Sequence, residues 1–180
     1  MEHFLNAIGR FSNNDINVFK EYTTIRTFNK NELLLKHGEI CKSVFYILSG
    51  SFYQFQMNEV DEIVIDLHLK NEWLFNHTSL INQSPSLTSI KAFAKAEVVE
   101  LSLTRLHDLI SKSSAYLQLG RLFNQASERI YFFDNCLTPA QKYGHLMEAK
   151  PLAMLTFPVK MIASYLKIAP ETLSRVRARC

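Results

Sequence analysis

Two short amphipathic segments near the C-terminus, within Phe157–Arg179, constrain the fold of this chain most. Pro158 can open a helix at no hydrogen-bond cost, because the first N–H groups of a helix have no intrahelical partner. The apolar residues of the first segment recur at the spacing of one helix face: Val159, Ile162, Ala163 and Leu166. Pro170 opens the second segment, where Leu173 and Val176 point inward at i and i+3. The pattern predicts two short helices joined by a tight turn.

The second predicted helix also carries a polar face that suits the major groove of DNA. Six of its side chains are the candidate DNA contacts: Glu171, Thr172, Ser174, Arg175, Arg177 and Arg179. An arginine can donate two hydrogen bonds to guanine, and a glutamate can accept one from cytosine. We therefore expect Arg175 and Glu171 to read bases and Thr172, Arg177 and Arg179 to contact phosphates. The pattern alone is also compatible with two amphipathic helices whose charged face is solvated and does not bind DNA.

The segment IASYLKIAPETLSRVRAR resembles the helix-turn-helix of the Crp/Fnr family of bacterial transcription regulators. The recognition helix of that family has a Glu-Thr/Ser-x-x-Arg core, which corresponds here to residues 171–175. This sequence departs from the family at two positions. Lys167 stands where a turn glycine is usual and Ala169 where a Ser/Thr cap is usual, and each change is expected to cost ~1 kcal/mol.

The charge distribution agrees with a C-terminal DNA contact. The whole chain has a formal charge of +3. Residues 1–137 carry 13 Lys/Arg against 15 Asp/Glu, whereas residues 138–180 carry 7 against 2. The excess of positive charge therefore lies in the segment that is expected to contact DNA.

Composition favours a folded protein of the cytoplasm. Hydrophobic residues make up 47% of the 180 residues, yet no apolar run approaches the ~20 residues of a membrane span. The N-terminus lacks the basic flank and apolar core of a signal peptide, so we expect no membrane partner. Cys41, Cys136 and Cys180 are too scattered for a disulfide framework or a metal cluster. Free thiols are expected, with no cofactor and no metal.

Residues 2 to about 22 predict one or two helices, with a break at Ser12 that can cap the second. From Thr24 the sequence consists of runs of β-branched and aromatic residues that are separated by turn residues. This pattern predicts short antiparallel strands. Within this region, LLLKHGEICKSVFYILSGSFYQFQ resembles the sensory domain of the same family, with its Gly-Glu turn at Gly38 and its Tyr-x-Leu/Ile-x-x-Gly pattern ending at Gly50. The resemblance implies a cyclic-nucleotide-binding-like jelly roll, a double-stranded β-helix.

Family members that bind cyclic nucleotides hold the phosphate and ribose with a short cassette like F-G-E-x-S-L-L-x-x-x-P-R-S-A. The equivalent stretch here is FNHTSLINQSPSLT, residues 75–88. Asn76 replaces the glycine, His77 the glutamate and Ser86 the arginine, with Leu87 following. Loss of the charge-assisted bonds, roughly 1.5–3 kcal/mol each, predicts a degenerate effector pocket without physiological cyclic-AMP binding. A different small pocket formed by His77 with His68, Trp73 and Ser86 stays open, as does an unidentified small-molecule effector.

A heptad seam follows the predicted strands. A short helix is expected over about residues 103–111, and then a longer one over about residues 112–137. The seam consists of Tyr116, Leu119, Phe123, Ala126, Ile130, Phe133 and Leu137. Such a stripe can pack on its own barrel, but the matching helix of the family forms the homodimer interface. We favour the homodimer, which would suit a pseudo-palindromic operator.

The predicted fold class is α+β, with two domains. Residues 1–137 form the cyclic-nucleotide-binding-like barrel domain with its connecting dimer helix, and residues 138–180 form the helix-turn-helix DNA-binding domain. Thr138 and Pro139 are expected to cap and open the first helix of the second domain.

The resemblance implies a transcription regulator that binds double-stranded DNA as a homodimer. The alternative is a degenerate family member that acts as a ligand-binding or protein-interaction dimer without DNA. An enzyme is not expected, because the chain has no phosphate loop, zinc spacing or nucleophile motif. Asp61, Glu62 and Asp66 are interpreted as a solvated strand edge.

Overall fold

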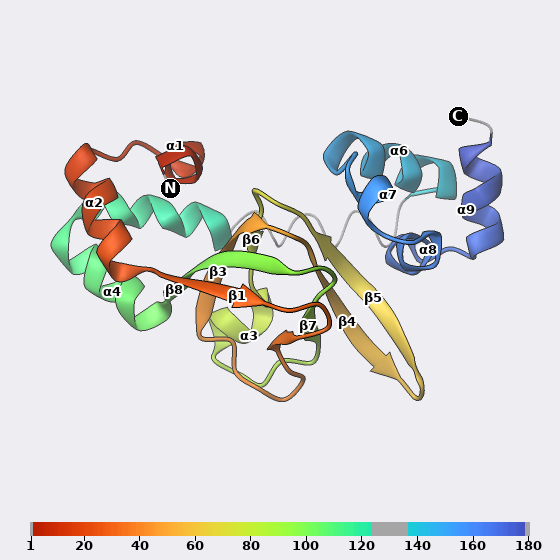
Figure 1. Cartoon of the computed structure of the whole chain (residues 1–180), viewed down its shortest axis with the longest axis horizontal. Coiled ribbons are helices and arrows are strands. Elements are labelled where there is room, and N and C mark those ends of the chain that lie inside the picture. Colours follow the sequence, from red (N-terminus) through yellow and green to blue (C-terminus); the bar gives the residue numbers. More distant parts are fainter. Residues whose placement is uncertain (1, 124–136, 179–180) are drawn as a thin grey trace.

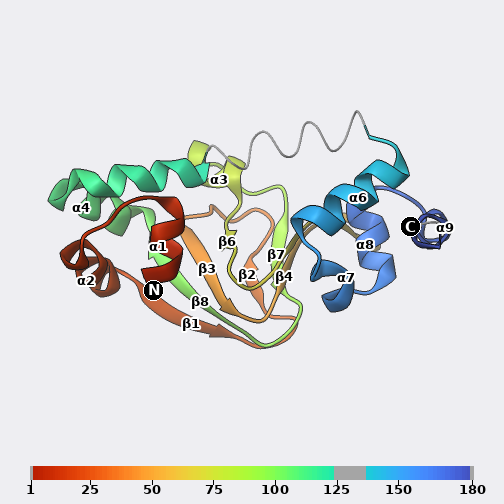
Figure 2. The ribbon, with the colours of Figure 1, turned by 90° about the horizontal axis from the view of Figure 1, so that it is seen from above.

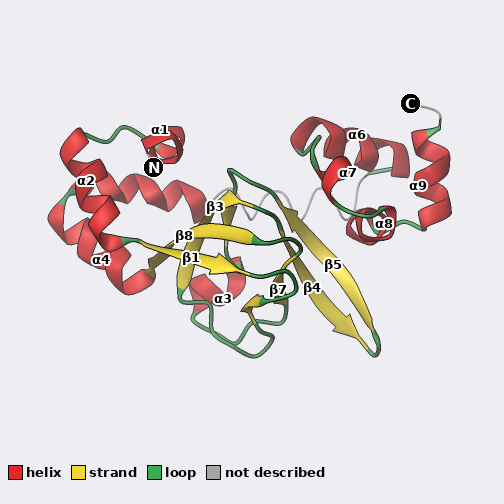
Figure 3. Ribbon diagram, in the orientation of Figure 1, coloured by secondary structure: helices red, strands yellow, loops and turns green. Residues whose placement is uncertain are grey.

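The computed structural model describes residues 2–123 and 137–178 of the chain. Helices and antiparallel sheets are both present, as the predicted α+β class requires (Figure 3). The barrel lies in the middle, with the N-terminal helices at one end and the C-terminal helices at the other (Figure 1). The elements are α1 Glu2–Ile8, α2 Asn13–Tyr22, β1 Thr24–Phe28, β2 Leu33–Leu35, β3 Ser43–Ser49, β4 Phe52–Asn58, β5 Asp61–His68, β6 Trp73–Leu74, α3 His77–Asn82, β7 Ser89–Ala92, β8 Ala96–Ser102, α4 Leu103–Lys112, the 3-10 helix η1 Ser114–Gly120, α6 Pro139–Ala149, α7 Ala153–Thr156, α8 Val159–Leu166 and α9 Pro170–Arg177.

Two four-stranded antiparallel sheets form the predicted jelly roll. Sheet A has the order β1-β8-β3-β6, and sheet B has the order β2-β7-β4-β5. Alternating residues of both sheets, such as Ile47, Phe52, Ile90 and Val98, are fully buried between them. In sheet B, Gln54 pairs with Ile90, so the neighbouring residues of β4 and β7 face away from this core.

The turn before β4 shows why the sequence places glycine there. Gly50 has a φ of +80°, which side-chain-bearing residues rarely adopt. A Cβ atom at this position would lie 2.4 Å from the backbone oxygen of Lys95. Backbone conformation and close packing thus both favour glycine at the predicted turn.

The N-terminal helices close one end of the barrel. Ser12 and Asp15 form a reciprocal capping box at the start of α2, which confirms the predicted break. In α1, the Phe4 ring stacks on Tyr46 of β3 with their centroids 4.2 Å apart. The phenol of Tyr116 donates a hydrogen bond to the backbone oxygen of Asp15, at 2.7 Å. These contacts join the N-terminal helices to the barrel and to the segment that follows it.

The helix expected to run from about residue 112 differs in its first turns. The chain leaves α4 at Ser113, which is extended with a φ of −153°, and residues 114–120 form the 3-10 helix η1. Tyr116 and Leu119 still share one face, because residues three apart align in a 3-10 helix. The spacing of Tyr116 and Leu119 is therefore compatible with an α-helix and with a 3-10 helix. The prediction of an α-helix was wrong for residues 114–120.

The C-terminal helices pack together and against sheet B. Helices α6, α8 and α9 contact one another, and α8 also contacts β5, an edge strand of sheet B. Figure 2, seen from above, shows α6, α7 and α8 on the β4 side of the barrel with α9 farthest from it. Thr138 caps α6 in a capping box with Gln141, and Pro139 opens the helix, as predicted.

Candidate nucleic-acid interface and effector pocket

Helices α8 and α9 are joined by a tight turn at residues 167–169. Lys167, at the position where glycine is usual, has a φ of 53° and is therefore left-handed. Ala169 provides no side-chain hydrogen bond to the start of α9, whose first residue is Pro170. The turn therefore has a left-handed residue that is not glycine, and the helix after it has no side-chain cap. The two helices form despite both departures.

Helix α9 has one buried residue and a broad polar surface. Leu173 is fully buried, whereas Glu171, Ser174, Arg175 and Arg177 are exposed. Thr172 is half-buried, and its hydroxyl accepts a hydrogen bond from Nη2 of Arg175 at 3.2 Å. Five of the six predicted DNA contacts therefore lie on one short helix. The sixth, Arg179, lies outside the described residues.

Helix α8 carries the apolar stripe that holds this pair of helices. Ile162, Ala163 and Leu166 are buried as predicted, and Tyr165 joins them. Val159 is 37% exposed, so its predicted burial was wrong. It is the first residue of α8, where the chain has only begun to approach its neighbours. The stripe therefore starts one turn later than its spacing suggested.

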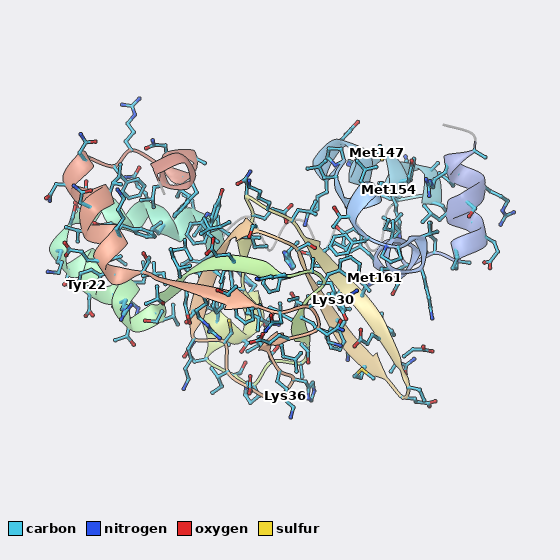
Figure 4. All side chains as sticks on the ribbon, viewed as in Figure 1. Tyr22, Lys30, Lys36, Met147, Met154 and Met161 are labelled. Carbon is cyan, nitrogen blue, oxygen red and sulfur yellow. The ribbon has the colours of Figure 1, made fainter. Side chains whose placement is uncertain are left out.

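A second hydrophobic core, here called the docking core, joins these helices to sheet B. It contains Tyr53, Phe55, Val64, Leu67, Leu69, Leu146, Ala153, Phe157, Ile162, Ala163, Tyr165, Leu166 and Leu173. The Phe157 ring lies 5.0 Å from that of Phe93, which follows β7. Figure 4 labels Met161 on α8 where that helix meets the sheet. The C-terminal helices thus share one apolar core with the outer face of the barrel.

Polar contacts complete this docking. The backbone N–H of Val64, on the outer edge of β5, donates to the hydroxyl of Ser164 on α8, at 2.9 Å. An edge strand otherwise presents unpaired backbone groups. The hydroxyl therefore satisfies one of these groups where the helix covers the edge.

Lys150, which ends α6, is only 3% exposed and reaches the barrel. Its Nζ atom donates to the backbone oxygen of Leu67, and it lies 2.9 Å from Oε2 of Glu72 and 3.4 Å from Oδ1 of Asp66. The His68 ring is within 4 Å of both carboxylates. Asp66, interpreted from the sequence as part of a solvated strand edge, instead belongs to a partly buried ionic contact between the two parts of the chain.

Sequence reasoning missed this docking surface, although one signal was present. Strand β4 begins with two aromatic residues in succession, Phe52 and Tyr53, which face opposite sides of the sheet. A strand with one solvated face alternates between apolar and polar residues, whereas a strand covered on both faces is continuously apolar. Together with Val64 on β5, the pattern could have indicated a covered outer face.

The cassette around α3 has its polar side chains bonded within the chain. Asn76 is 7% exposed, and its Oδ1 caps α3 by accepting from the N–H of Ser79 at 2.8 Å. Its amide nitrogen donates to the hydroxyl of Thr88 at 2.8 Å, and Gln54 donates to the same hydroxyl at 2.7 Å. Ser86 is 1% exposed and donates to the backbone oxygen of Thr88.

The other predicted cassette residues are directed elsewhere. Nε2 of His77 lies 2.8 Å from the backbone oxygen of Phe123. Leu87 is 71% exposed and lines a cavity on the outer face of sheet B. Asn76, His77, Ser86 and Leu87 thus do not point their side chains into one common space.

The alternative pocket of His77, His68, Trp73 and Ser86 is not assembled either. Trp73 packs edge-on against the rings of Phe4 and Tyr46. His68 belongs to the Lys150 cluster. The four side chains contact four different sets of partners.

The predicted dimer seam is described only in part. Tyr116 and Leu119 are buried in the core of their own chain, and Phe123 is half-buried against it. Burial raises the pKa of the Tyr116 phenol to about 12. Leu137 is half-buried, while Ala126, Ile130 and Phe133 lie outside the described residues. The seam's first two positions therefore already have partners within the protomer.

No group of His, Cys, Asp and Glu side chains among residues 2–123 and 137–178 could hold a metal ion. Within the same residues, no helix has the length and apolar character needed to cross a membrane. Cys41 is a free, buried thiol, and its burial raises its pKa.

Comparison with known proteins agrees with this geometry. Residues 25–113 match the family model of the cyclic nucleotide-binding domain. No curated protein sequence matches the chain. FixK2 from Bradyrhizobium japonicum is similar in structure with a TM-score of 0.67 and 14% identity, over 87% of this chain and 83% of that one. The catabolite activator protein of Thermus thermophilus gives a TM-score of 0.58 and 15% identity, over 94% and 83%.

A third similar structure is described as a putative cAMP-binding regulatory protein from Silicibacter pomeroyi DSS-3, with a TM-score of 0.64 and 17% identity over 93% of this chain and 80% of that one. At these identities the likeness extends to the fold. The chain therefore shares the fold of these proteins, and its residues 25–113 are similar to the cyclic nucleotide-binding domain.

Proposed function

We propose that the chain is a DNA-binding transcription regulator of the Crp/Fnr type, which reads a pseudo-palindromic operator as a homodimer. The observation that carries the proposal is the division of α9 into a buried and an exposed side. Leu173 anchors the helix, and Glu171, Ser174, Arg175 and Arg177 are exposed. A helix held in this manner can enter the major groove without losing its packing.

Arg175 and Glu171 are the proposed base readers. The Arg175 guanidinium contacts the Thr172 hydroxyl in the free protein, so it already lies along the helix surface. A bidentate contact to guanine would replace this single hydrogen bond. Thr172, Ser174 and Arg177 would contact phosphates, and Arg179 would extend the same surface.

The homodimer is proposed from the second half of the seam, because Tyr116 and Leu119 are buried within the protomer. Two copies related by a two-fold axis would place their α9 helices in half-sites about 34 Å apart. The proposed operator is therefore a palindrome with half-sites one helical turn apart.

Cyclic AMP is not the proposed effector. The hydroxyl of Thr88 already accepts from Asn76 and Gln54, and Ser86 donates to the backbone. A cyclic phosphate would have to displace these bonds and would find no arginine at Ser86 or Leu87. Micromolar affinity for cyclic AMP in calorimetry would contradict this part of the proposal.

The test of DNA binding is fluorescence anisotropy with a palindromic fragment from the gene's own upstream region, at several salt concentrations. We expect affinity to fall with salt and Arg175→Ala to weaken binding roughly tenfold to a hundredfold. Arg10→Ala removes the same charge at an exposed position near α1 and should change affinity less than about twofold. Absence of binding even at low salt would favour the alternative, a ligand-binding or protein-interaction dimer without DNA.

A further inference from the structure

The outer face of sheet B is covered by the C-terminal helices over only part of its extent. Beyond the docking core it carries a cavity of about 570 Å³. The lining residues come from β2, β4, β5, β7 and the loops beside them: Leu33, Lys36, His37, Phe55, Gln56, Met57, Glu62, Leu87, Thr88, Ser89 and Lys91. The volume is within the range of ordinary small-molecule sites. The cassette's buried residues Asn76 and Ser86 are not among the lining residues, and the cavity shares only Leu87 and Thr88 with the cassette.

Strand register explains how these residues come to share one face. Phe55 pairs with Ser89, and Met57 pairs with Glu62. Directly paired residues of antiparallel strands lie on the same face of the sheet. Gln54 pairs with Ile90, which is buried in the barrel core, so the Phe55 pair faces the other way. The pairing of the strands therefore determines which of their side chains line the cavity.

The apolar part of the lining is unusually open to solvent. Leu33 is 40% exposed, Met57 53% and Leu87 71%. Phe55 is buried, and it belongs to the docking core as well as to the cavity. Apolar side chains that gather in a cavity are stabilised when a ligand removes them from water.

The charged part of the lining is mostly positive. Two lysines, Lys36 and Lys91, line the cavity together with His37 and one acidic side chain, Glu62. Nζ of Lys91 pairs with Glu62 and lies 4.6 Å from the centre of the Phe55 ring. Lys36 is exposed, and Figure 4 shows it at the border of the barrel. A ligand that complements this lining carries one negative charge beside an apolar body.

We propose that this cavity binds a small carboxylic acid with an alkyl or aryl body. The carboxylate would contact Lys36 and Lys91, since charge-assisted hydrogen bonds to a carboxylate are the strong ones. The body would cover Leu33, Met57 and Leu87. The carboxylate competes with Glu62 for Lys91. Because of this competition, binding should depend on the charge at residue 62, which binding to a purely apolar surface would not.

Calorimetric titration of the full chain with octanoate tests the proposal. We expect saturable binding, and we expect octyltrimethylammonium, which has the same chain and the opposite charge, to bind at least about tenfold more weakly. No heat with octanoate, or equal affinity for the two probes, would overturn the proposal. The titration contains no DNA, so its outcome is separate from that of the operator experiment.

Two variants locate the site. Leu87→Asp adds a carboxylate to the cavity at an exposed position and should weaken octanoate binding at least about tenfold. Glu62→Gln frees Lys91 and should strengthen it about threefold. The matched control is Val60→Asp, which makes the same kind of change at an 88% exposed residue outside the lining. Equal binding by the Leu87 and Val60 variants would show that octanoate binds elsewhere, and would overturn the proposal.

Discussion

The cassette around α3 and helix α9 both carry polar side chains beside an apolar core, but these side chains have different partners. In the cassette, Asn76, Ser86 and Thr88 bond to one another or to the backbone. On α9, Glu171 and Arg177 are exposed to solvent. A segment whose polar groups are mutually satisfied stabilises the fold, whereas an open polar surface is available to a partner.

The C-terminal unit itself combines both kinds of surface. Its inner side is tied to the barrel by Lys150 and Ser164, and its outer side carries Arg175. Substitutions on the two sides should therefore separate stability from binding. The predictions below use this difference, beginning with the largest expected effect.

Lys150→Met should destabilise the protein most, by about 2–3 kcal/mol. It leaves Asp66 and Glu72 without their cation and the backbone oxygen of Leu67 without its donor. Breaking a fully buried ion pair costs more, but these carboxylates are 29% and 27% exposed and keep some solvent. The free energy of unfolding in urea measures the effect.

The matched control is Lys160→Met on exposed α8 surface, which should change the free energy of unfolding by less than about 0.5 kcal/mol. Arg175→Ala should be equally neutral. If Lys150→Met proves as mild as these two variants, the ionic contact between α6 and the barrel does not hold the docking, and the contrast between the two sides is lost.

Asn76→Ala tests the closed cassette and should destabilise by about 2 kcal/mol. The variant removes the cap of α3 and one of the two donors to Thr88, in a buried environment. Thermal or urea unfolding measures the loss, and Asn82→Ala at the exposed end of the same helix is the control. Equal stability of the two variants would mean that the cassette's hydrogen bonds are replaced by water.

Local sequence signals predicted the elements well. Ser12 and Thr138 were recognised as caps because serine and threonine before a helix pattern favour capping, and the structure adds a capping box at each. The turn position of Lys167 followed from the resemblance, and its left-handed backbone agrees with the glycine that is usual there. Short antiparallel strands followed from the alternation of apolar runs and turns, whereas their arrangement as a jelly roll was implied by the resemblance.

Long-range contacts were not predicted, for a physical reason. The pairing of Lys150 with Glu72 joins residues 78 positions apart, and no local pattern determines which face of β5 a helix will cover. The cassette's identity was recognised by resemblance, but the closure of its hydrogen bonds depends on Gln54 from another strand. Leu87 lies in the loop before β7, where no periodic pattern in the sequence determines the direction of a side chain.

The smallest expected effect on stability is that of Asp15, which forms an exposed capping box with Ser12. Hydrogen bonds from the side chain and then the backbone of Ser12 hold the pKa of Asp15 below the ordinary 3.8. A carboxylate with a depressed pKa adds stability above the unfolded pKa, and this stability is lost as pH falls through the folded pKa. At pH 7, Asp15→Asn should therefore cost about 0.5–1 kcal/mol. The difference between wild type and variant should vanish well below pH 3.8. Urea unfolding at both pH values measures it, with Asn14→Ala as the control on the same turn; a difference that does not change with pH would assign the loss to packing instead of charge.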